Sequence, residues 1–165
     1  MKFEGDISLD QELIKTIRGY SGYERTEWRE KTDQRLREYM ASQIQKIGSN
    51  FQNLSAHLQK FDNPDIARSI KRLIKQLKIL IQSLHQPSYE KSSFFNLSEV
   101  NSGILTQLYE YESQIKHQVD ILADEVSELE NMDDVSDSGE LINHLFDVVD
   151  NLNQSIMERE FLLAG

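Results

Sequence analysis

The chain has 165 residues, a formal net charge of −10 and no cysteine. The lack of cysteine excludes a disulfide framework, thiol catalysis and zinc or iron–sulfur sites built on cysteine. The length suits a single domain over residues 1–165, and the two prolines and seven glycines favour long exposed helices over a sheet. The first ten residues lack the apolar core of a signal peptide, and no window approaches a membrane span, so we expect a cytoplasmic protein.

Charge is divided unevenly along the chain. Residues 1–91 contain 16 Lys and Arg against 12 Asp and Glu, whereas residues 92–165 contain 2 against 16. The simplest expectation is that the basic and acidic halves pack side by side and partly neutralise each other across the helix contacts. The alternative is a separate basic surface that binds a partner.

Residues 1–23 are predicted to form a short helix followed by an aromatic loop that contains glycine. In the stretch SLDQELIKTIRG, Ser8 is placed to cap the helix and Gln11 is its capping-box partner. Gly19 supplies the residue type that commonly ends a helix.

A long helix is predicted from about residue 24 to residue 60. Its apolar residues alternate at spacings of four and three, which is the pattern of a coiled-coil core. They are Met40, Ile44, Ile47, Phe51, Leu54, Leu58 and Phe61.

The next helix completes a first hairpin over residues 24–86. Asp62 or Asn63 is placed to cap it, Pro64 fits its first turn, and the helix is expected to stop before Pro87. The same spacing of four and three recurs in Ile66, Ile70, Leu73, Leu77, Leu80 and Leu84. A short connection between two matching apolar stripes makes the helices antiparallel.

An aromatic loop over residues 87–96 leads into a second hairpin over residues 97–165. Its helices are predicted at about 97–131 and 140–163, again with apolar residues three and four apart, except that Glu112 occupies one of these positions. The predicted architecture is therefore all-α: an elongated antiparallel four-helix bundle or coiled coil with a short N-terminal helix.

Two aromatic segments are expected to meet at one end of this bundle. Asn96 and Glu99 have the spacing of a capping box, and Phe95 and Val100 that of a hydrophobic staple, which would start the third helix at Leu97. The aromatic residues left to explain are Tyr20, Tyr23, Trp28, Tyr89 and Phe94. They either cover the last layer of the core or form a tip that binds a partner.

The segments GYSGYERTEWREKTDQRLR, SYEKSSFF and LYEYE together resemble a family of small prokaryotic all-helical proteins without an assigned activity. The resemblance covers about residues 19–129. The family pattern favours Asp at the position of Glu112, which is a departure. The resemblance implies an all-helical protein that works with partners, and it implies no catalytic residue.

Glu112 is the ionisable residue that most needs an explanation. A lone buried carboxylate is energetically costly, so this one is expected to reach water or to meet a cation. Arg29, Arg35 and Arg37 come from the same end of the predicted bundle, with Asp33 among them, and are the candidate partners. A structural ion pair is the favoured interpretation, because a general acid or base would need a cleft and a second positioned group.

The sequence offers no other chemistry. The four histidines lie on four different segments, and none belongs to a Glu-x-x-His motif of the kind that binds two iron ions. A glycine-rich phosphate loop and a Gly-x-Ser-x-Gly elbow are also missing. We therefore expect no enzymatic activity, no metal, no cofactor and no identifiable small-molecule substrate.

The second long helix carries basic residues within an arc of about 120°, opposite its apolar stripe. These residues are Arg68, Lys71, Arg72, Lys75 and Lys78. Ile79 falls inside the same arc. Such a face is either solvated or paired with the acidic helices, or it binds an anionic membrane, an acidic protein or nucleic acid.

The leading hypothesis is a non-enzymatic interaction or scaffold module that docks a protein partner or self-associates. The alternative is a peripheral protein of the membrane surface, which binds anionic lipid through the basic face. Nucleic acid is the least favoured partner, because the protein is acidic overall and the basic helix has no interleaved aromatic residues.

Overall fold

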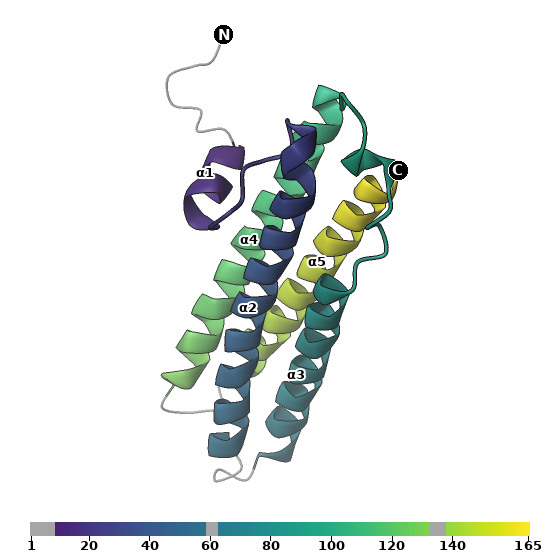
Figure 1. The fold of residues 1–165 in the computed structure, drawn as a ribbon. Helices are drawn as coiled ribbons and strands as arrows, with labels where there is room; N and C mark the ends of the chain where they lie inside the picture. The colour runs from purple at the N-terminus through teal and green to yellow at the C-terminus, as the bar shows by residue number, and fades with distance from the viewer. Residues whose placement is uncertain (1–8, 59–62, 133–137) are drawn as a thin grey trace.

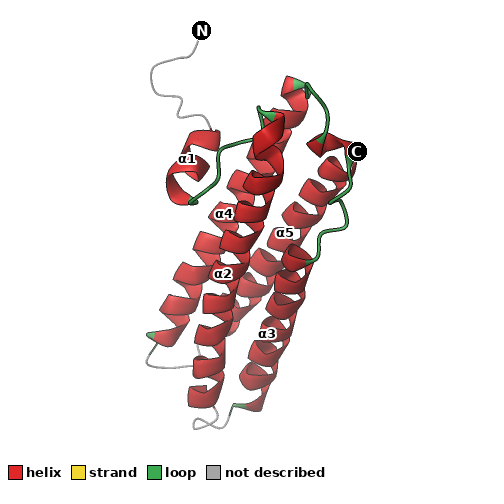
Figure 2. Cartoon of the chain, in the orientation of Figure 1, coloured by secondary structure: helices red, strands yellow, loops and turns green. Residues whose placement is uncertain are grey.

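The computed structural model describes residues 9–58, 63–132 and 138–165, and within these ranges every regular element is a helix (Figure 2). The all-α prediction is confirmed. The elements are α1 (Leu9–Thr16), α2 (Thr26–Leu58), α3 (Pro64–His85), the short 3-10 helix η2 (Ser93–Phe95), α4 (Ser102–Glu130) and α5 (Gly139–Ala164).

Helices α2 to α5 form an elongated four-helix bundle, and α1 lies against α4 (Figure 1). The hairpins α2–α3 and α4–α5 are each antiparallel. They pack together through α2 against α4 and through α3 against α5, so α3 and α4 occupy diagonally opposite corners. The C-terminal end of α5 lies beside the connection between α3 and α4.

The predicted apolar positions supply the core. On α3, for example, Ile70, Leu73, Leu77, Leu80 and Leu84 are all buried, while the predicted basic residues lie on the outside. Spacings of three and four place these side chains on one side of the helix, where they are removed from water together. The predicted positions Leu58 and Phe61 lie outside the described side chains.

Helix ends follow local signals in one case and long-range packing in the other. Asn63 caps α3 as predicted, accepting a hydrogen bond from the Ile66 backbone N–H at 3.4 Å. The predicted start of α4 at Leu97 is wrong. Asn96 instead follows η2, and Asn101 caps α4 by accepting a hydrogen bond from Gly103 N at 2.7 Å. The proposed cap Ser8 lies outside the described residues.

Gly22 joins α1 to α2 with a φ of +83°, and a Cβ added there would lie 2.9 Å from Tyr109 Oη. We expect Gly22→Ala to lower the free energy of unfolding by about 2 kcal/mol, because the left-handed backbone and the tyrosine both oppose a side chain. Urea denaturation measures this. The control is Gly48→Ala inside α2, where a Cβ meets nothing within 4 Å; it should stabilise by about 0.5–1 kcal/mol. Equal effects at the two glycines would contradict the explanation.

Candidate functional site

The aromatic segments meet at one end of the bundle, between the start of α2 and the end of α5. Tyr20, Tyr23, Tyr89 and Phe94 are each no more than 6% exposed. The rings of Tyr23 and Phe94 lie 5.8 Å apart, so the two segments are in contact. Trp28 differs: it is 38% exposed, and the Arg25 guanidinium lies 4.6 Å from its ring. Four of the five aromatic residues therefore cover the core, and Trp28 faces outward.

Below these rings, Glu112 of α4 is fully buried and forms an ion pair with Arg159 of α5. Arg159 Nε lies 2.8 Å from Glu112 Oε2. Tyr20 donates its hydroxyl to Oε1 at 2.5 Å, and Tyr23 donates to Oε2 at 2.6 Å. Both carboxylate oxygens thus accept hydrogen bonds from charged or polar donors, which offsets the energy of removing the carboxylate from water.

Arg159 also binds a second buried carboxylate, that of Asp33 on α2. Its Nη2 lies 2.6 Å from Asp33 Oδ1, and Tyr89 donates its hydroxyl to the same oxygen at 2.7 Å. The other oxygen of Asp33 accepts from Arg37 Nε at 3.0 Å. We call Tyr20, Tyr23, Asp33, Tyr89, Glu112 and Arg159 the buried polar network. It ties α2, α4 and α5 to both aromatic segments.

The prediction that Arg29, Arg35 or Arg37 pairs with Glu112 is wrong. Arg29 is buried and donates to backbone carbonyls, among them Tyr23 O at 2.8 Å. Arg35 pairs with Glu38 on the surface, and Arg37 pairs with Asp33. The cause is geometric, since α5 runs antiparallel to α4 and so brings Arg159 to the level of Glu112.

The sequence did contain a signal for Arg159. It continues the apolar positions of its helix at the same spacing, being three residues after Ile156 and four before Leu163. A cation at a core position of one helix complements a carboxylate at a core position of the neighbouring helix. Arg159 is also one of only two basic residues after position 91.

The environment moves the pKa values of the two carboxyls in opposite directions. Burial raises the pKa of Glu112, and the Arg159 charge and the two tyrosine hydroxyls oppose that rise. Burial also favours neutral Asp33, but Arg159, Tyr89 and Arg37 together outweigh it and hold the pKa of Asp33 below its usual value. Burial likewise raises the pKa of Tyr89, so its hydroxyl stays protonated at neutral pH.

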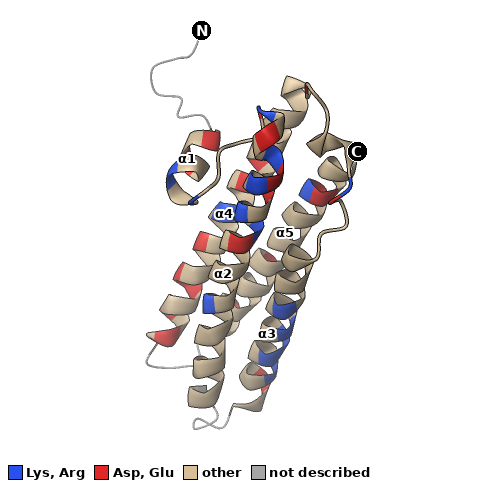
Figure 3. Ribbon diagram, in the orientation of Figure 1, with Lys and Arg blue, Asp and Glu red and all other residues tan. Residues whose placement is uncertain are grey.

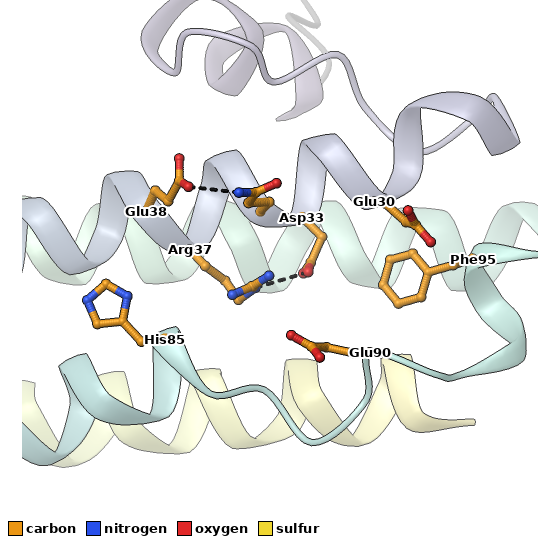
Figure 4. A pocket seen from close by; sticks show the side chains of 8 residues that line it. Glu30, Asp33, Arg37, Glu38, His85, Glu90 and Phe95 are labelled. Atoms are coloured by element: carbon orange, nitrogen blue, oxygen red, sulfur yellow. Dashed lines mark hydrogen bonds and ion pairs between the residues drawn. The ribbon is translucent and has the colours of Figure 1, made fainter.

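An open pocket of about 530 Å³ lies beside the network, between α2, the end of α3 and the aromatic loop (Figure 4). It is lined by Glu30, Asp33, Gln34, Arg37, Glu38, His85, Glu90 and Phe95. Asp33 is its most buried ionisable residue, but both Asp33 oxygens already accept hydrogen bonds, as Figure 4 shows for Arg37. The buried carboxylate of the pocket wall is thus already bonded, whereas Glu30, His85 and Glu90 line the pocket without an ion pair to any described residue. Among the described residues, no group of three or more His, Asp or Glu is arranged to hold a metal ion.

Comparisons with protein-family models, curated proteins and solved structures find no match. The family resemblance therefore stays a prediction.

The predicted basic face lies on the outer side of α3 (Figure 3). Arg68 pairs with Asp65, and the Arg72 guanidinium lies 5.1 Å from the ring of Phe146. The remaining three residues, Lys71, Lys75 and Lys78, are exposed and form no ion pair with any described residue. The expected neutralisation by the acidic half therefore does not reach these lysines: α3 packs against α5 of that half, but no ion pair joins the two helices among the described residues.

Proposed function

We propose that the chain is a non-enzymatic interaction module, in which a rigid helical bundle presents an outer face to a protein partner. The buried polar network supports the non-enzymatic part of this proposal. Its carboxylates, guanidinium and tyrosine hydroxyls bond to one another, so their chemistry is used to hold the fold together. Saturated groups of this kind are poor candidates for proton transfer, which needs a base within reach of a substrate.

The observation that carries the proposal is the surface shared by α3 and α5. Three lysines on α3 have no ion pair with the described residues, and Ile79 beside them is 54% exposed. Ile79 and Asn153 line a shallow groove between the two helices. Met157 and Phe161 follow one and two turns later on α5, at 55% and 83% exposure. Exposed apolar side chains bordered by charges are typical of docking surfaces.

Site-directed photo-crosslinking tests the proposal in cells. A photoreactive residue at position 79 should give covalent adducts with protein, because the groove faces a partner there. The matched control is position 42, where Ser42 lies on the exposed side of α2 and should give none. If position 79 and position 161 both remain free of protein adducts, the proposed docking surface is wrong.

A second candidate function is binding to an anionic membrane surface, favoured by the exposed lysines with Ile79 beside them. None of the helices in the described part of the chain combines the length and apolar composition that crossing a bilayer requires. Binding would therefore take place at the headgroup surface. Co-sedimentation with anionic liposomes at low salt, compared with the Lys71→Glu/Lys75→Glu variant, separates this function from protein docking.

A further inference from the structure

We infer that the partner of the basic α3 face is the acidic side of α4 in a second copy of the same chain. This inference rests on the proposed function and names its partner. Two stripes of opposite charge carry it, and they lie at the same level on opposite corners of one bundle.

The basic stripe consists of Lys71, Lys75 and Lys78. Their spacings of four and three place them on one side of α3, over about 10 Å of helix. All three are exposed and have no ion-pair partner in the described part of the chain. This stripe therefore offers three positive charges to a neighbouring molecule.

The acidic stripe consists of Asp120, Asp124 and Glu128, spaced four residues apart on the exposed side of α4. Asp120 already accepts a hydrogen bond from Lys116 at 2.8 Å. Asp124 and Glu128 form no ion pair with described residues. The acidic stripe spans about 12 Å, which is close to the length of the basic one.

Contacts to α5 show that the two stripes lie at the same level along the bundle. Arg72 of α3 lies over Phe146, and Glu125 of α4 pairs with His144. Those two α5 residues are two positions apart, which is about 3 Å along a helix. The middle of the basic stripe is thus level with the middle of the acidic stripe, on opposite sides of the bundle (Figure 3).

Two bundles placed side by side in the same orientation bring α3 of one against α4 of the other, with lysines facing carboxylates. The helices then run antiparallel, as α3 and α4 do within one chain. The net charge of −10 repels at long range, but at about 0.15 M salt the screening length is about 8 Å, so contacts between the stripes dominate. Ile79 adds apolar area beside the lysines.

Because each contact uses two different faces, the assembly is head-to-tail. A contact of this type leaves one basic and one acidic face unused in every dimer, so growth continues until a ring closes or the ends remain open. The stripes predict a distribution of sizes that depends on concentration, rather than one closed dimer.

Charge-swapped variants and light scattering test the inference. The average mass of the wild-type chain should rise above 19.2 kDa with concentration at about 0.15 M salt, and return to that value at about 1 M salt. Lys71→Glu/Lys75→Glu and Asp124→Lys/Glu128→Lys should each remain at 19.2 kDa. An equimolar mixture of the two variants should associate again, because the unchanged α3 of one variant complements the unchanged α4 of the other, and the two reversed stripes also complement each other.

The control is Lys31→Glu/Lys46→Glu, which changes two exposed lysines of α2 and alters the net charge as much as the α3 variant does. It should associate like the wild type. A wild-type chain that stays at 19.2 kDa at every concentration, or a mixture that fails to associate, overturns the inference. If adducts at position 79 then contain a different protein, the proposed function stands without self-association. Binding of single chains to anionic vesicles would instead favour the membrane function.

Discussion

Replacing Arg159 with methionine should lower the free energy of unfolding by about 3–5 kcal/mol, because two buried carboxylates then lose their shared cation. Glu112 is fully buried and Arg159 is 3% exposed, so water cannot replace the lost contacts. Asp33 keeps Arg37, whereas Glu112 keeps only hydroxyl donors. Urea denaturation with two spectroscopic probes measures the change.

The control for this variant is Arg35→Met. Arg35 also pairs with a carboxylate, but both side chains are nearly half exposed, and such pairs contribute about 1 kcal/mol or less. Arg159→Lys should destabilise nearly as much as methionine, since one ammonium cannot span Glu112, Asp33 and the Tyr89 hydroxyl as the planar guanidinium does. An Arg159→Met protein that unfolds at the wild-type urea concentration would show that the network adds nothing to stability.

Replacing Arg29 with methionine should cost about 3 kcal/mol, for a different reason. Arg29 is fully buried and holds the aromatic loop to the start of α2 by donating to Leu97 O at 2.6 Å and Phe94 O at 3.1 Å. It also donates to Tyr23 O in the other aromatic segment. Each buried carbonyl that loses its donor costs about 1–3 kcal/mol.

Hydrogen exchange locates the effect of Arg29→Met. The backbone N–H of Asn96, which donates to Ser93 O at 2.9 Å, should exchange faster when the loop is released. The exchange rates of amides in the middle of α3 should rise only as much as the lower global free energy of unfolding requires. Arg25→Met is the control. Arg25 lies just before the start of α2, as Arg29 lies just after it, but its side chain is exposed and its ion pair with Glu27 measures 4.0 Å. Equal loop protection in the two variants would contradict the assigned role of Arg29.

The helices could be predicted from the sequence because their signals are local. Apolar spacing fixes the buried side of each helix, and Asn63 with Pro64 marks the start of α3 without reference to the rest of the chain. The start of α4 could not be predicted in this way. Asn96 and Asn101 are both suitable caps, and the choice depends on the packing of Phe94 and Phe95 in η2, which is set by distant residues.

The site was predictable only in part. Its burial followed from one carboxylate at a core position, and the meeting of the aromatic segments followed from the antiparallel order of the helices. The partner of Glu112 is 47 residues away, so its identity depends on the register between α4 and α5. The contacts of Arg29 could not be predicted from the sequence. They are made to backbone carbonyls, which every residue has, so no residue type marks the acceptors.

The span of the buried polar network along the chain has a consequence for the order of folding. Arg159 is 126 residues from Asp33 and 136 from Tyr23, whereas each hairpin closes through a short connection. The chain therefore loses little entropy when the contacts within a hairpin form, and it loses more when the buried polar network forms. Glu112 gains the guanidinium when the second hairpin closes, whereas Asp33 gains it only when the two hairpins dock. Sealing of the aromatic end is thus a late event that reports the docking of both hairpins.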